Sequence, residues 1–123
     1  MLVEVSLTIT TAADGTFDDV IGSNLTGRVA AIKYAPGTIV TGADLTITGK
    51  TTAVPILKKT DAGTATVWYY PKVIPNKNTD ASAFTDVAAD IFIYRESIRV
   101  EVAQGGDSKT GTMTFYIDER SPY

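Results

Sequence analysis

Hydrophobic and polar residues alternate along most of this chain, which is the pattern of β-strands that bury one face. The clearest case is residues 2–10 (LVEVSLTIT), where every second residue from Val3 to Ile9 is aliphatic and the residues between them are polar. A short segment around Pro55 is expected at a sheet edge, where the missing N–H costs little. The strands predicted after the first are residues 27–34, 43–48, 54–57, 64–70, 91–94, 97–104 and 110–118.

Clusters of Gly, Asn, Asp and Pro separate these segments, as is typical of sandwiches and barrels. Residues 104–109 (QGGDSK) are predicted to turn a long hairpin between the last two strands. Residues 81–89 suit either a short helix capped by Asp80 or a loop. We therefore predict one domain over residues 1–123, an all-β antiparallel β-sandwich of roughly seven to nine strands that is Ig-like in general character.

Charge and hydropathy argue mainly against two classes of partner, nucleic acids and membranes. The 123 residues carry a net charge of −3, and the only adjacent pair of basic residues is Lys58-Lys59, so we expect no nucleic-acid binding. No apolar run approaches the ~20 residues that span a bilayer, and the first residues do not resemble a signal peptide. We expect a protein that is made in the cytoplasm and does not enter a membrane.

The chain contains neither Cys nor His. This excludes disulfides, Ser-His-Asp and Cys-His catalysis, and zinc sites built from these residues. We expect no catalytic residue, no metal and no cofactor. One enzymatic alternative stays open, a glycosidase that uses two carboxylates, although nothing in the spacing places two of them across a cleft. The candidates are Asp14, Asp18, Asp19, Asp86, Asp90, Glu96 and Glu101.

The most suggestive cluster is Trp68, Tyr69 and Tyr70. Alternation places Trp68 and Tyr70 on one face of their strand and Tyr69 on the other. Three interpretations fit: packing in the core and under a loop, an anchor at a protein interface, or a platform for sugar rings. The polar tail adds Arg120 and Tyr123 as further candidates for an interface.

Several segments resemble a group of small proteins encoded among the virion structural genes of tailed bacteriophages. The matching residues are 24–34 (NLTGRVAAIKY), 43–49 (ADLTITG), 70–71 (YP), 96–106 (ESIRVEVAQGG) and 109–112 (KTGT). They follow the family's order over most of the chain. The Ala-Gln-Gly-Gly turn that leads to Lys-Thr-Gly-Thr is the most specific part of the resemblance.

The resemblance implies a non-enzymatic protein of the virion, on the head surface. Its partners would be the major capsid protein and neighbouring copies of itself, arranged as dimers or trimers. It implies a capsid decoration (cement) protein, with a head–tail connector, a tail component or a module that adheres to host glycans as alternatives. The candidate contacts are the N-terminal strand, residues 75–90 and the tail from Arg120 to Tyr123.

Overall fold

The computed structural model describes residues 1–119, and these contain strands but no helix, so that none is long and apolar enough to cross a membrane. Seven strands form one antiparallel sheet in the order β1-β9-β2-β8-β3-β4, with β5 paired to β2, and β6 and β7 form a separate pair. The predicted all-β, sandwich-like fold of roughly seven to nine strands is confirmed, and the described residues form nine. The strands are β1 (Leu2–Thr10), β2 (Phe17–Ala35), β3 (Asp44–Gly49), β4 (Pro55–Lys59), β5 (Val67–Tyr69), β6 (Lys72–Val73), β7 (Ala89–Asp90), β8 (Phe92–Ala103) and β9 (Thr110–Glu119).

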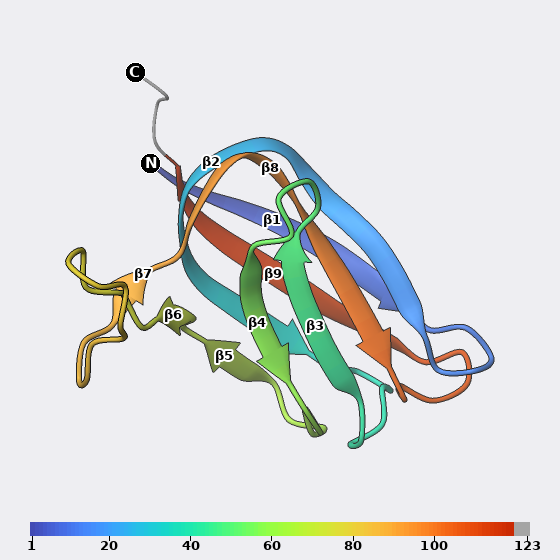
Figure 1. Cartoon of the computed structure of the whole chain (residues 1–123). Coiled ribbons are helices and arrows are strands. Elements are labelled where there is room, and N and C mark those ends of the chain that lie inside the picture. Colours follow the sequence, from blue (N-terminus) through green and yellow to red (C-terminus); the bar gives the residue numbers. More distant parts are fainter. Residues whose placement is uncertain (120–123) are drawn as a thin grey trace.

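The long strand β2 joins the two layers of the sandwich. Its first half pairs with β8, which continues to β3 and β4, and its second half lies between β9 and β5. Figure 1 shows β8, β3 and β4 in front of β9 and β1, with β2 curving around one end. The curve coincides with register shifts near Leu25 and with positive φ angles at Gly22 (81°) and Gly27 (144°). The turn residues near Gly22 therefore bend one strand instead of ending it.

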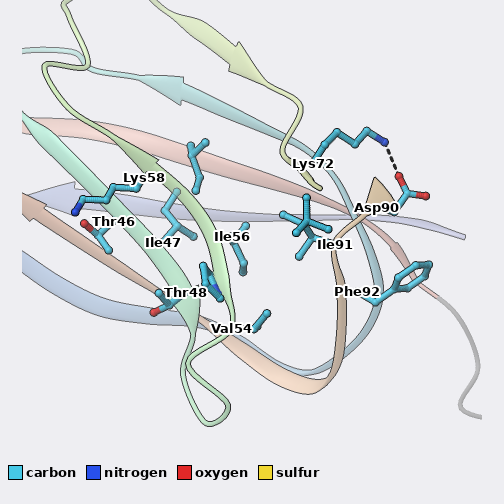
Figure 2. Close-up of a pocket in the computed structure, with 13 residues that line it drawn as sticks. Thr46, Ile47, Thr48, Val54, Ile56, Lys58, Lys72, Asp90, Ile91 and Phe92 are labelled. Carbon is cyan, nitrogen blue, oxygen red and sulfur yellow. Dashed lines mark hydrogen bonds and ion pairs between the residues drawn. The ribbon is translucent and has the colours of Figure 1, made fainter. Parts of the chain in front are cut away.

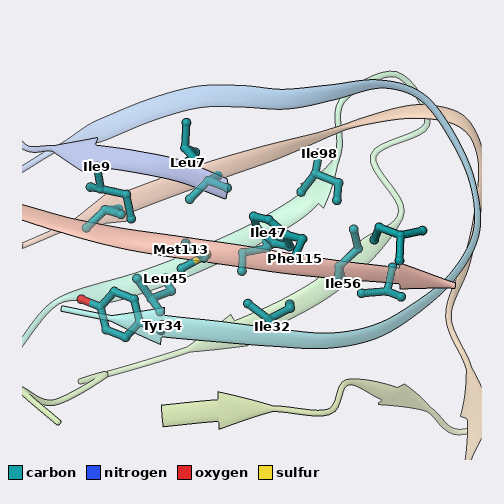
Figure 3. Packing of buried hydrophobic residues seen from close by; sticks show 14 of the residues in the cluster. Leu7, Ile9, Ile32, Tyr34, Leu45, Ile47, Ile56, Ile98, Met113 and Phe115 are labelled. Atoms are coloured by element: carbon teal, nitrogen blue, oxygen red, sulfur yellow. The ribbon is translucent and has the colours of Figure 1, made fainter. Parts of the chain in front are cut away.

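The core lies between the layers and takes side chains from both. Ile9, Ile32 and Phe115 come from one layer and Leu45 and Ile98 from the other, and all are fully buried (Figure 3). In β1 the predicted alternation is confirmed, because burial increases at every second residue from Val3 to Ile9. Burial of aliphatic side chains at about 25 cal/mol per Å² is the main stabilising contribution in such a core.

The predicted hairpin between the last two strands is wrong. β8 pairs with β2 and β3, whereas β9 pairs with β1 and β2, so residues 104–109 cross from one layer to the other. The crossing segment is held by hydrogen bonds from the Gly105 N–H to the Gly15 carbonyl (2.9 Å) and from the Thr11 hydroxyl to the Gly106 carbonyl (2.6 Å). A Gly-rich sequence permits a turn, but partners elsewhere in the chain decide what the turn connects.

A further prediction needs correction. The two segments expected at residues 91–94 and 97–104 form the single strand β8, because Arg95 takes a positive φ of 47° and is absorbed as an irregularity in the pairing with β2. Its N–H is satisfied by the Thr26 hydroxyl at 3.0 Å. Of the two structures left open for residues 81–89, the structure has the loop, which contains the bridge at Ala83 and leads into β7 at Ala89.

Candidate interaction surface

The aromatic strand β5 presents Trp68 to solvent and Tyr69 to the core, which confirms the predicted division of faces. Trp68 is 43% exposed, and its ring stacks on that of Tyr116 at a centroid distance of 5.3 Å. The Lys33 ammonium lies 5.6 Å from the same ring. Tyr69 is half-buried, and burial raises its pKa. Tyr70 is exposed just beyond the strand. Arg120 and Tyr123 lie outside the described residues.

An arm formed by residues 70–90 projects from one end of the sandwich (Figure 1). Its base is the β6–β7 pair, and beyond the base a single bridge joins Asn76 to Ala83. The arm exposes several large apolar side chains, among them Ile74, which is 60% exposed, and Phe84 and Val87. An isolated two-stranded hairpin is marginal in water, and clustered apolar exposure marks contact sites.

A groove, which we call the edge groove, lies between β4 and the base of the arm (Figure 2). Its volume is about 430 Å³. Buried Ile47, Ile56 and Ile91 are among its lining residues, together with Val73 and Phe92, which are exposed. Most of the lining is apolar, and this volume falls in the range of about 300–1,000 Å³ that is typical of binding sites.

One wall of the edge groove is a free strand edge. Within the described part of the chain, β4 pairs only with β3, so its other side carries backbone groups without a strand partner. Lys58 and Lys59 end this strand, and neither takes part in an ion pair with any residue from 1 to 119. Lysines at a strand edge discourage uncontrolled pairing with other chains. Lys58 also lines the groove and gives its rim a positive group.

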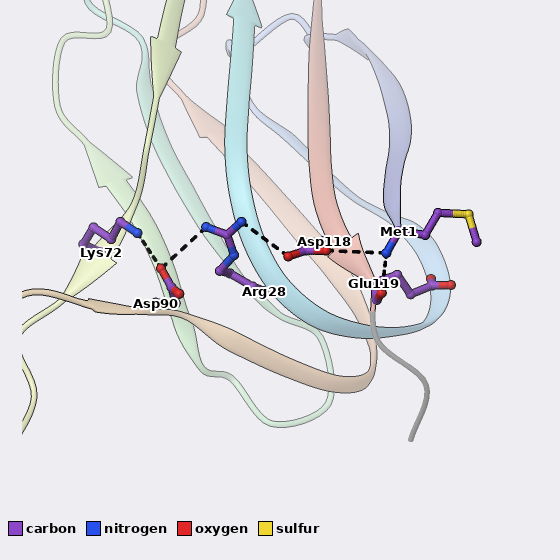
Figure 4. Close-up of polar contacts among 6 residues, drawn as sticks. All are labelled: Met1, Arg28, Lys72, Asp90, Asp118 and Glu119. Carbon is purple, nitrogen blue, oxygen red and sulfur yellow. Dashed lines mark hydrogen bonds and ion pairs between the residues drawn. The ribbon is translucent and has the colours of Figure 1, made fainter. Parts of the chain in front are cut away.

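A chain of ion pairs ties the base of the arm to the sandwich (Figure 4). The Lys72 ammonium pairs with Asp90, which also lies 3.8 Å from the Arg28 guanidinium. Arg28 reaches Asp118 at 3.4 Å, and Asp118 lies 3.6 Å from the Met1 amine. Partly exposed pairs of this kind each contribute about 0–1 kcal/mol. Their main effect is therefore to orient the arm.

Three of the candidate carboxylates, Asp14, Asp18 and Glu96, have a lowered pKa. Asp18 is held by Arg99 at 2.7 and 2.9 Å, and these hydrogen bonds lower its pKa. For Glu96, burial raises the pKa, but hydrogen bonds from Thr51, Thr52 and Ser97 outweigh this and lower it to about 2. A general acid at neutral pH needs a raised pKa. Among the described residues there is also no group of three or more His, Cys, Asp or Glu that could hold a metal.

The other carboxylates lie apart in the fold. Asp14 bonds to Thr16 in its own turn, and Asp86 lies on the arm. Asp19 accepts a hydrogen bond from the N–H of Val20. Glu101 does face Asp18 across β2 and β8, and with Asp44 they line a depression of about 400 Å³ that spacing along the chain did not predict. Both Asp18 and Glu101 lie near the single cation of Arg99, so the arrangement is that of a surface ion-pair network.

Residues 75–90 were named as a candidate contact from the sequence, but the edge groove and the apolar character of the arm were not predicted. Residues 72–92 contain no sustained alternation, so Ile74, Phe84 and Phe92 could have belonged to the core. The available signal was the Pro at position 55, which correctly indicated that β4 is an edge.

Comparison with known proteins finds no relative of this chain. No protein-family model, no curated protein and no solved structure matches the chain. The resemblance to phage virion proteins therefore stays a prediction.

Proposed function

We propose that this chain is a structural protein of a tailed-phage virion, a decoration (cement) protein that binds the major capsid protein on the head surface. The observation that carries the proposal is the exposed apolar arm beside the edge groove, because apolar patches on a small protein mark contact sites, here with the shell or with neighbouring copies on it. The resemblance described above supplies the setting.

When many copies of one small protein coat a shell, each contact between a copy and the shell can be weak. Several weak contacts that act together give high overall avidity. A stable β-core with polar strand faces and one projecting arm suits that task. The net charge of −3 also disfavours binding of the packaged genome in place of the shell.

The test is the position and copy number of the chain in purified particles of the phage that encodes it. We expect quantitative mass spectrometry to find enough copies to coat the head, and the purified chain to bind expanded heads that lack it. A few copies, set by the symmetry of a ring, would point to a connector or tail part. Failure to bind undecorated heads would end the decoration proposal.

Glycan adhesion is a second candidate, favoured by the exposed ring of Trp68 stacked on Tyr116. We expect Trp68→Ala to abolish retention on a glycan array while the unfolding temperature changes little. Phe92→Ala, which removes an exposed ring elsewhere, is the matched control. Equal retention of the wild type and Trp68→Ala would remove this candidate.

A further inference from the structure

We propose that the edge groove is the docking site for the arm of a second copy of this chain. The inference names the contact between copies that the proposed function leaves unspecified. It is tested on the purified chain alone, so either proposal can fail without the other.

The arm and the groove both present apolar surfaces to solvent. The arm exposes Ile74, Phe84 and Val87, and its bridge and cation–π contact (Lys77 to Phe84, 5.9 Å) leave these side chains open to solvent. The groove offers an apolar lining that no described residue covers. Joining the two would remove both apolar surfaces from water, which is the main driving force of association.

Charge selects the same pairing. Lys58, which lines the groove, has no ion-pair partner within residues 1–119, and neither do Asp80 and Asp86 on the arm. Opposite charges at the rim of an apolar contact steer association and fix its register. The arm offers apolar side chains and two acidic groups without ion-pair partners, while its Lys77 lies over the ring of Phe84 on the same arm.

The arm of the same copy does not fit the groove. Its base supplies Lys72, Val73 and Asp90 as a wall of the groove, and the rest of the arm projects away from the sandwich (Figures 1 and 2). Entry of the arm into its own groove would require β6 and β7 to separate and would break the ion pair of Lys72 with Asp90. A second copy supplies an arm without that cost. Because arm and groove are neighbours, a two-fold pair can exchange both arms at once.

The free edge of β4 can strengthen the contact between the two copies. Its unpaired backbone donors and acceptors can receive an extended segment by β-augmentation. Backbone hydrogen bonds then add to the side-chain contacts.

The first experiment measures molar mass by size-exclusion chromatography with light scattering over a range of protein concentration. We expect reversible association of the wild type, and an association constant at least about tenfold lower for Phe84→Asp on the arm and Phe92→Asp on the groove. Val20→Asp is the matched control, since Val20 is an exposed side chain on β2 outside the arm and groove. A wild type that stays monomeric throughout would overturn the proposal, as would variants that associate like the wild type.

Mixing the two variants tests the pairing itself. The Phe84→Asp chain retains its groove and the Phe92→Asp chain retains its arm, so we expect the mixture to form pairs that neither variant forms alone. No association in the mixture would overturn arm-in-groove docking. Ile74→Asp is a second arm variant, at a side chain that is 60% exposed. It shows whether an effect of Phe84→Asp comes from a lost contact or only from unfolding of the arm. Arm variants that associate like the wild type but no longer bind undecorated heads would assign the arm to the shell and overturn arm-in-groove docking.

Discussion

Tyr34 carries a hydroxyl group that is buried and has no hydrogen-bond partner among the described residues. Burial, and secondarily the neighbouring Tyr69, raises the pKa of Tyr34 to about 12. A buried hydroxyl without a partner costs about 1–3 kcal/mol. We expect Tyr34→Phe to increase the free energy of unfolding by about 1 kcal/mol at pH 7, measured by urea denaturation.

The direction of the pH dependence follows from the raised pKa. Above pH 10 the unfolded chain loses the phenol proton while the folded chain keeps it, so the wild type loses stability as the pH rises toward 12. Tyr34→Phe should escape that loss, and its advantage should grow over this range. Tyr34→Ala, which leaves a cavity, should instead lose about 3–5 kcal/mol. A destabilised Tyr34→Phe would mean that the hydroxyl is satisfied.

Glu96 is only 1% exposed, yet its carboxylate accepts hydrogen bonds from the backbone N–H groups of Thr51 (2.9 Å), Thr52 (3.0 Å) and Ser97 (3.0 Å), and from the Thr52 hydroxyl (2.8 Å). Its pKa is lowered from 4.5 to about 2. The stabilisation is therefore complete above pH 4.5 and is lost as the pH falls through 2. We expect it to amount to about 3 kcal/mol.

The test replaces the carboxylate by an amide. Glu96→Gln cannot accept all four bonds, so we expect it to be less stable than the wild type by about 2–3 kcal/mol at pH 7. The difference should shrink as the pH falls from 5 to 2, in urea titrations at each pH. Glu101→Gln changes an exposed carboxyl of the same strand and is the control. A constant difference across this pH range would contradict the bound carboxylate.

At the scale of the element, β2 depends on Gly27. A Cβ at this position would lie 2.1 Å from the backbone oxygen of Asp118, and its φ is 144°. We expect Gly27→Ala to lower the free energy of unfolding by more than about 2 kcal/mol, because backbone atoms of β9 would have to move. Gly63→Ala has a positive φ of 82° and open space around it, so it isolates the conformational cost. Equal losses, measured by thermal unfolding, would contradict a close approach of β2 and β9.

The strands also show how much of this fold the alternation of hydrophobic and polar residues predicts. Alternation located β1 to the residue, since one face of this strand packs on the core and the other is exposed to solvent. The same pattern predicted a β2 that was too short and split β8 into two strands. In the structure, Asn24 and Arg95 have positive φ angles and lie at irregularities in strand pairing, and the strands continue through them. The partners of β8 and β9 could not be predicted, because they depend on contacts between distant segments. For the site, alternation separated Trp68 from Tyr69 but could not say which side faced solvent.

At the scale of the whole molecule, arm exchange would link stability to concentration. A chain whose folded copies associate is stabilised by mass action, so its unfolding temperature rises with protein concentration. We expect this rise for the wild type in calorimetric scans and little or none for Phe84→Asp. The control is Val20→Asp, which should follow the wild type. An unfolding temperature independent of concentration in the wild type would argue against exchanged arms in the folded state.

The strand that serves both layers also has a kinetic consequence. Because β2 supplies hydrogen-bond partners to β8 on one side of its bend and to β9 and β5 beyond it, neither layer can lose that strand without exposing the core of the other. The amide protons of Ile32 and Ile98, buried in opposite layers, should then exchange with solvent only through one shared global opening. The sandwich would behave as a single cooperative unit, which suits a protein that must hold its shape while its arm is engaged elsewhere.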